Sequence, residues 1–196
     1  MKTVVNLGCG APGAGRLPGL FQDWREVRVD VDPAMQPDLV ADMTDLSAIA
    51  TGSADALWSS HSIEHLYVHQ VGQAVAEFYR ILTDDGFACI IVPDLQVLAN
   101  YIVADKLHEV IYQSPAGPIT PHDVVFGLGS AIARGRVSMA HRCGFTPSMM
   151  LQQLRYAPFA EIVLRRRPSM ELAAIASKER FADQADREAL LTALEL

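Results

Sequence analysis

A short apolar run that ends in a glycine-rich loop most constrains the fold of this chain. Val4, Val5 and Leu7 stand directly before the segment Gly8–Gly13, whose sequence GCGAPG has the spacing G-x-G-x-x-G. A short apolar run bounded by glycines is typical of a buried strand. Glycine lets the backbone approach a ligand closely and adopt dihedral angles that other residues avoid. The pattern therefore predicts a strand followed by a loop that is able to hold a small ligand.

Further apolar runs and one helical stripe continue this pattern along the chain. We expect strands over residues 27–32, 38–42, 54–59 and 87–92. Val71, Val75, Phe78 and Leu82 have helical spacing, which predicts an amphipathic helix that ends at 84–86. Residues 159–164 and 172–175 predict two strands that pair as an antiparallel hairpin. Strands that alternate with helices are typical of an α/β fold with a mostly parallel sheet.

Length and patterning predict one domain over residues 1–196. A chain of 196 residues is little longer than an average domain of ~150 residues, and it can bury a core without a disulfide or a structural metal. From 106 to 146 the apolar pattern weakens, and glycine and proline are frequent. We therefore expect 95–146 to be an inserted segment that caps a substrate, or an irregular crossover.

The charge balance disfavours several classes of partner. A net charge of −7 and a pI near 5.3 argue against nucleic acid, because an acidic surface repels phosphate backbones. No apolar run approaches the ~20 residues of a membrane span, and the stretch before Gly8 is too short for a signal peptide. An odd count of 3 cysteines is typical of reduced thiols, so we expect a cytoplasmic protein.

An acidic residue follows the glycine loop at the spacing of nucleotide-binding sites. Asp30 lies 22 positions after Gly8, at the end of the second predicted strand, where a carboxylate can hydrogen-bond ribose hydroxyls. This pattern by itself fits nicotinamide, flavin and S-adenosylmethionine sites alike. A dinucleotide also needs a full helix N-terminus for its pyrophosphate, and the prolines and glycines over 11–24 leave no room for a long helix.

Four segments, in order, resemble the class I S-adenosylmethionine-dependent methyltransferases of the type-11 subgroup. These are Val5–Gly10, Val29–Pro33, Ala41–Leu46, and Ala54–Leu66 together with Arg80–Gly86 and Ile91–Asp94. The resemblance covers residues 3–95 well and 141–178 loosely. It implies a Rossmann-like sheet of seven strands that is mostly parallel, with an antiparallel strand in the C-terminal hairpin and helices on both faces.

The resemblance also implies S-adenosyl-L-methionine as the cofactor and a set of residues that hold it. Gly8 and Gly10 would meet the methionine half, Asp30 the ribose hydroxyls, and Asp42 the adenine amine. The full set is Asn6, Gly8, Cys9, Gly10, Asp30, Val31, Asp42, Met43, Ser59 and Ser60. The expected reaction is methyl transfer to a small-molecule, saccharide or lipid-linked acceptor.

Two departures from the family pattern bear on this expectation. The family usually has an acid where this chain has Asn6, and an amide removes a negative charge near the cationic end of the cofactor. Many members also carry helices before the first strand, which here starts near residue 1. We therefore expect the site to be covered by 95–146 or by a second copy of the chain. Leu190, Leu191 and Leu194 would pack either within the chain or against such a copy.

Other interpretations of these features stay open from the sequence. The chain could be a cofactor-binding partner subunit that transfers nothing, or an NAD-dependent oxidoreductase. Cys9 lies between two glycines, but no histidine is placed beside it to activate a nucleophile. The run Arg165–Arg167 predicts either a solvated hairpin tip or a site for an anionic substrate.

The histidines after the fourth predicted strand allow three roles. His61-Ser62-Ile63-Glu64-His65 matches a zinc-peptidase pattern, and His69 would join it if one helix ran through the segment. The family resemblance explains these residues without a metal, so we expect none. His65, His61 and His141 are candidate general bases for the acceptor. His65 could instead be a helix-start residue held by a backbone hydrogen bond.

Overall fold

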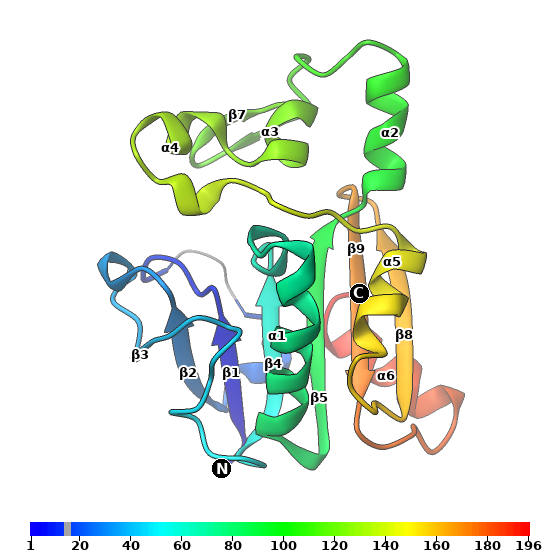
Figure 1. Ribbon diagram of the computed structural model, residues 1–196. Coiled ribbons are helices and arrows are strands. Elements are labelled where there is room, and N and C mark those ends of the chain that lie inside the picture. The colour runs from blue at the N-terminus through cyan, green and yellow to red at the C-terminus, as the bar shows by residue number, and fades with distance from the viewer. Residues whose placement is uncertain (14–16) are drawn as a thin grey trace.

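A single seven-stranded sheet forms the centre of the molecule (Figure 1). The computed structural model describes residues 1–13 and 17–196. The strand order is β3-β2-β1-β4-β5-β9-β8, and β9 runs antiparallel to the other six strands. The predicted fold class is confirmed. The strand bounds are β1 Thr3–Leu7, β2 Arg25–Asp30, β3 Leu39–Val40, β4 Ala54–Ser60, β5 Leu82–Pro93, β8 Glu161–Arg167 and β9 Glu171–Ser177.

Helices cover both faces of the sheet because its central strands are apolar on both sides. Figure 1 shows α1 (Val68–Ile81) and α5 (Pro147–Leu154) in front, where they pack on Val5, Leu57 and Ile90. Behind the sheet, the alternate residues of the same strands contact α6 (Gln184–Ala193) and the short 3-10 helix η1 (Gly19–Phe21). This alternation is the period-two geometry of a strand with two buried faces.

Residues 95–146 rise from the end of β5 and form a lobe above the carboxyl ends of the strands (Figure 1). We call this lobe the cap. The chain returns from it at Phe145, which bridges to Asp94 beside β5. The region expected to be irregular therefore holds several short elements. They are α2 Leu95–Val103, β6 Tyr112–Ser114, β7 Gly117–Ile119, α3 Pro121–Phe126, α4 Gly129–Ala133 and the 3-10 helix η4 Val137–Met139.

Several predicted boundaries differ from the structure, because strand and helix ends are set by their neighbours in the fold. Strand β2 is shifted toward the N-terminus, because residue 31 already leaves the sheet and a 3-10 helix, η2 (Pro33–Met35), follows. Helix α1 ends at Ile81, and 82–86 already belong to β5. The run Arg165–Arg167 lies within β8 rather than at a hairpin tip. Each arginine there pairs with a carboxylate, of Glu188, Asp94 and Glu171 in turn, which gives the run a structural use.

The described residues contain no helix that combines the length and the apolar character needed to cross a membrane.

Candidate active site

The predicted cofactor residues gather at one edge of the sheet. Strands β1, β2, β3 and β4 are parallel, so their carboxyl ends share that edge. Ligands of open α/β sheets bind outside the carboxyl ends of the strands. The structure brings to this edge the glycine loop after β1, Asp30 and Val31 at the end of β2, Asp42 and Met43 after β3, and Ser59 and Ser60 at the end of β4.

Side chains of β2 hold the glycine loop in place. The Gly10 amide donates to Asp30 Oδ2 over 2.9 Å, and the Arg28 guanidinium donates from Nη2 to the Gly10 carbonyl over 2.6 Å. Asp30 Oδ1 accepts a second backbone hydrogen bond, from Asp32. Because both polar groups of Gly10 are bound by β2, the loop is formed before any ligand arrives. Arg28 was not among the predicted site residues, although it lies on the same side of β2 as Asp30, two positions earlier.

Contact with the chain itself explains why position 8 is a glycine. Gly8 has φ +67°, and a Cβ built on it would lie 2.1 Å from Ser62 Oγ. Ser62 is buried beneath the loop, and its hydroxyl donates to the Leu7 carbonyl over 3.2 Å. The loop after β1 therefore packs directly on the segment after β4.

Asn6 and Cys9 face the η1 side of the loop, where both line an open cavity that also includes Phe21, Glu26 and Arg28. Asn6 Nδ2 donates to Glu26 Oε1 over 2.8 Å, so its amide is engaged by the neighbouring strand. Burial, opposed by the nearby Arg28 charge, raises the pKa of the Cys9 thiol. A raised pKa lowers the thiolate fraction, which agrees with a packing role for Cys9 rather than a nucleophilic one.

Among the other predicted cofactor residues, some have exposed apolar surface and some have polar atoms without a hydrogen-bond partner in the described part of the chain. The Val31 side chain is 57% exposed directly beside Asp30. Asp42 uses Oδ1 to accept two hydrogen bonds from Thr44, and no hydrogen bond reaches Oδ2 from the described residues. Met43 packs against the main core. Ser59 is fully buried, and its hydroxyl has no partner among the described residues.

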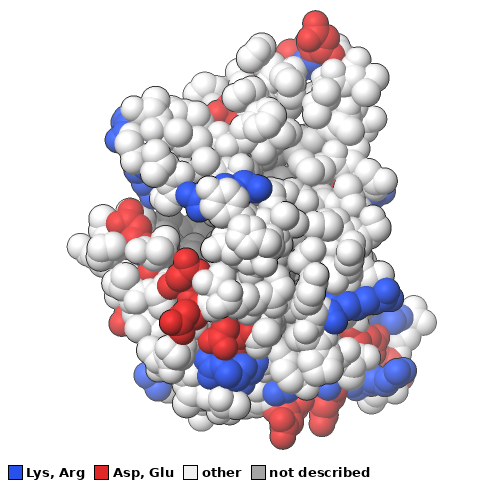
Figure 2. Space-filling view, in the orientation of Figure 1, with Lys and Arg blue, Asp and Glu red and all other residues white. Residues whose placement is uncertain are grey.

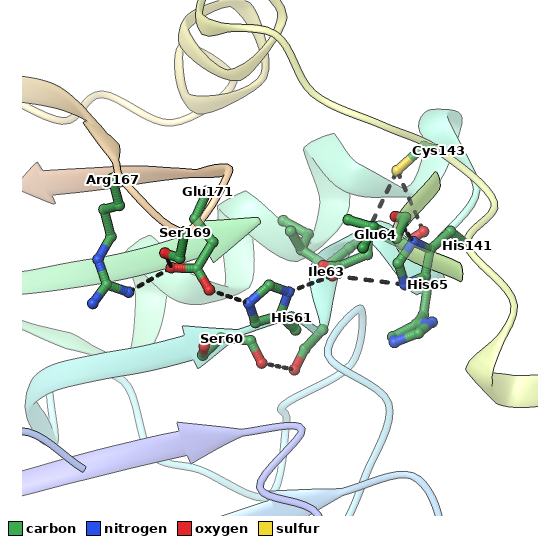
Figure 3. A network of polar contacts seen from close by, with 12 residues as sticks. Ser60, His61, Ile63, Glu64, His65, His141, Cys143, Arg167, Ser169 and Glu171 are labelled. Atoms are coloured by element: carbon green, nitrogen blue, oxygen red, sulfur yellow. Dashed lines mark hydrogen bonds and ion pairs between the residues drawn. The ribbon is translucent and has the colours of Figure 1, made fainter. Parts of the chain in front are cut away.

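His61 lies between two carboxylates (Figure 3). It follows β4 with φ +51°, and its Nε2 is 2.8 Å from Glu171 Oε1, while its Nδ1 is 3.5 Å from Glu64 Oε1. Burial lowers the pKa of His61, but the hydrogen bond to Glu171 and the nearby Glu64 carboxylate outweigh burial and raise the pKa to about 10. An imidazolium with both nitrogens engaged is poorly suited to accept a proton, which argues against His61 as the general base. No sequence pattern pointed to Glu171, which comes from β9.

Glu64, His65 and His141 form a second group beside His61 (Figure 3). Glu64 and His65 lie in the 3-10 helix η3 (Ile63–His65), and His141 comes from the return of the cap. Burial raises the pKa of Glu64, yet His61 and the two other histidines outweigh burial and lower it. Burial lowers the pKa of His141. His65 Nδ1 bonds to a backbone carbonyl, of Ala140, as one interpretation of the sequence expected, but His65 is the last residue of η3 and not the start of a helix.

One continuous helix through His61, His65 and His69 does not form. His61 has a left-handed backbone, η3 ends at His65, and α1 starts at Val68. His69 is exposed on α1 and stacks on Tyr67. The zinc-peptidase pattern needed one helix through these three histidines, and that expectation is wrong. The histidine that lies beside Glu64 and His65 is instead His141, which is distant in sequence.

Comparison with known proteins tests the predicted family resemblance. Residues 5–90 match the family model described as a methyltransferase domain. Over these residues the match confirms the predicted resemblance to the class I S-adenosylmethionine-dependent methyltransferases. A search of curated protein sequences gave no match.

Solved methyltransferase structures share the fold at low sequence identity. A SAM-dependent methyltransferase from Archaeoglobus fulgidus is 13% identical, with a TM-score of 0.56 and coverage of 90% of this chain and 86% of that one. A second, from Methanosarcina mazei, is 13% identical with a TM-score of 0.57, covering 89% and 91%. At 13% sequence identity, the similarity shows a shared fold and nothing finer. Each comparison covers about nine-tenths of this chain.

Proposed function

We propose that this protein binds S-adenosyl-L-methionine at the carboxyl ends of β1, β2 and β4, and moves its methyl group to a small-molecule acceptor. The observation that carries the proposal is the Asp30 carboxylate, which anchors the glycine loop and lies beside the exposed Val31. A carboxylate has about four acceptor positions, and Asp30 uses one on each oxygen, so capacity for two ribose hydroxyls is left.

The chemistry of the residues at this edge fits the cofactor. Val31 offers apolar surface for one face of adenine, and Asp42 Oδ2 is available for its amine. The described part of the segment between β1 and β2 holds only the three-residue helix η1, which is a poor site for a pyrophosphate. This favours S-adenosylmethionine over NAD. The family match supports the same cofactor.

The bound cofactor supplies a methyl group that is already activated as a sulfonium. The chain therefore mainly has to align the acceptor and exclude water, and alignment can contribute about 7–11 kcal/mol in favourable cases. We assign the alignment to the segment after β4 and to the cap, which lies above this edge (Figure 1). An acceptor that carries a proton needs a group to take it. His65 and His141 are the candidates, because His61 is held between Glu64 and Glu171.

A small-molecule acceptor agrees with the charge distribution. In Figure 2, basic and acidic side chains stand in separate small groups, with no continuous basic stripe among the described residues of this face. A phosphate backbone would need such a stripe. The three cysteines are free thiols, which supports the expected cytoplasmic location. A homodimer, in which a second copy adds cover to the site, is part of the same proposal.

Thermal unfolding with added ligand tests the cofactor. At about 100 Kd, S-adenosylmethionine should stabilise the chain by about 2.7 kcal/mol, which corresponds to roughly 5–10 °C for a domain of this size. D30N should remove most of this shift, because a neutral amide loses the charged hydrogen bonds to ribose. D32N is the matched control, since Asp32 instead caps η2 by accepting from Ala34.

The remaining outcomes separate the alternatives. A shift with NADH and none with S-adenosylmethionine would overturn the proposal in favour of an oxidoreductase. Cofactor binding without formation of S-adenosylhomocysteine, across a library of small-molecule and saccharide acceptors, would favour a non-catalytic binding protein.

A further inference from the structure

Glu64 is a buried carboxylate whose oxygens lack hydrogen bonds. It is 1% exposed, and neither Oε1 nor Oε2 has a hydrogen-bond partner among the described residues. The His61 Nδ1 atom approaches Oε1 only to 3.5 Å, which is longer than an ordinary hydrogen bond. No hydrogen bond or ion pair of the described residues reaches Oε2. A buried carboxylate without hydrogen bonds is costly, so this position calls for a further partner.

Two imidazoles, of His65 and His141, lie beside this carboxylate. His65 Nδ1 lies 3.1 Å from the Ala140 carbonyl, and His141 Nδ1 lies 3.0 Å from the Val124 carbonyl. A carbonyl oxygen only accepts, so each Nδ1 carries the proton and each neutral ring keeps its lone pair on Nε2. A histidine that donates its other N–H to a backbone carbonyl is the usual arrangement in metal ligands.

The three groups are close enough to share one cation. A ligand atom from each of Glu64, His65 and His141 lies within 4.8 Å of the other two, and His141 Nε2 is 3.9 Å from Glu64 Oε1. Ligand distances of about 2.0–2.2 Å place neighbouring ligand atoms roughly 3.0–3.5 Å apart. Small side-chain rotations would therefore close the set around a metal.

The backbone already holds the two halves of this cluster together. The amides of Arg142 and Cys143 both donate to the Glu64 carbonyl, over 2.9 and 3.2 Å. His141 is thus positioned against η3 without help from a metal. Because the site is mostly formed in advance, little ordering has to accompany binding.

We propose that Glu64, His65 and His141 form a binding site for a divalent transition-metal cation such as Zn²⁺. One carboxylate oxygen and two imidazole nitrogens are ligand types that suit Zn²⁺ and Fe²⁺. Such a cation would connect the return of the cap to the segment after β4, and three protein ligands leave at least one coordination position for water or another ligand. The observations behind the site do not depend on methyl transfer. A bound metal would occupy the lone pairs that make His65 and His141 candidate bases, so each of these histidines can serve only one of the two roles at a time.

Titration of the chelator-stripped full-length chain with Zn²⁺ tests the site. Calorimetry should give one equivalent per chain, and Co²⁺ bound in its place should give a visible absorption spectrum. H141A and E64Q should each weaken Zn²⁺ binding by about 100-fold or more, since even the loss of groups that only support a ligand costs 10–100-fold. Far-UV circular dichroism checks that each variant is folded. H141A is the more informative variant, because E64Q changes a buried residue.

Two matched controls decide which histidines are involved. H69A removes the exposed histidine of the sequence pattern, and H122A removes a cap histidine that stacks on His108. Both should keep the stoichiometric site and the Co²⁺ spectrum. The proposal is overturned if no stoichiometric site is found, if the site survives in folded H141A, or if H69A or H122A abolishes it.

Discussion

At the scale of single residues, the glycine loop depends on Gly8 for two separate reasons. Its φ of +67° lies in the left-handed region, and Ser62 occupies the space that a side chain would need. Gly52 has a similar φ of +64°, but the nearest atom to its Cβ position, the Leu82 carbonyl oxygen, is 4.0 Å away. The two glycines therefore separate backbone strain from crowding.

We expect G8A to lower the free energy of unfolding by about 2–5 kcal/mol, as the sum of left-handed strain and overpacking. G52A should cost only about 1–2 kcal/mol, which is the strain alone. Urea unfolding at neutral pH measures both.

A double-mutant cycle checks the assignment to Ser62. S62G would leave the Ser62 Cα, at 3.8 Å, as the nearest atom of that residue to an added Cβ. In this background the cost of G8A should fall to that of G52A. An unchanged cost would show that Ser62 is not the source of the crowding.

At the scale of elements, one ion pair on α1 fixes the connection between β3 and β4. Glu77 binds Arg80 through two hydrogen bonds of 2.7 Å, and its Oε2 also accepts from the Leu46 amide. Arg80 in turn donates to the carbonyls of Leu46 and Ile49. The loop after Asp42 is therefore held by the helix that packs beneath it.

This pair predicts a pH-dependent contribution to stability. Hydrogen bonds from Arg80, opposed by burial, lower the pKa of Glu77 below its ordinary value. A carboxylate with a lowered pKa in the folded state stabilises the protein above its unfolded pKa of about 4.3, and that contribution is lost as pH falls through the folded pKa. E77Q should therefore cost about 1–2 kcal/mol at pH 7 and progressively less below about pH 4.

Urea unfolding of wild type and E77Q across this pH range measures the difference. E109Q is the control, because Glu109 forms only an exposed pair with Lys106 and should change stability by less than about 0.5 kcal/mol at either pH. If E77Q lowers the free energy of unfolding as much at pH 3 as at pH 7, the pH dependence does not come from the Glu77–Arg80 pair.

At the scale of the whole molecule, the sheet and the cap differ in how much they bury. The central strands β4, β5 and β9 are buried almost throughout. Between residues 104 and 140, by contrast, the described buried residues are Ile119, Pro121, Gly127 and Ala131. Segments with few buried contacts open locally at a lower free energy than the core.

We expect amide hydrogen exchange to show this difference directly. Amides of β4, β5 and β9 should exchange only through global unfolding, whereas amides of the cap should open at a free energy lower by at least about 2 kcal/mol. Exchange monitored by mass spectrometry resolves the two regions. Equal protection of both would mean that the cap and the sheet unfold as one unit.

Local patterns in the sequence were enough for the sheet and for the edge where the cofactor site is proposed. The apolar runs, the glycine loop and the spacing of Asp30 are properties of short segments, and the family resemblance placed them in order. Boundaries were less certain, as the early end of α1 and the arginines within β8 show. Strand ends depend on pairing with neighbours such as β9, which no local pattern contains.

The surroundings of the histidines were decided only by the tertiary structure. The sequence by itself determined that His61, Glu64 and His65 follow a central strand, because that depends on a few adjacent residues. It could not show that Glu171 reaches His61 from β9, or that His141 returns from the cap to Glu64. These partners lie more than 70 positions away along the chain, and only the packing of the hairpin and the cap on the sheet edge brings their side chains together.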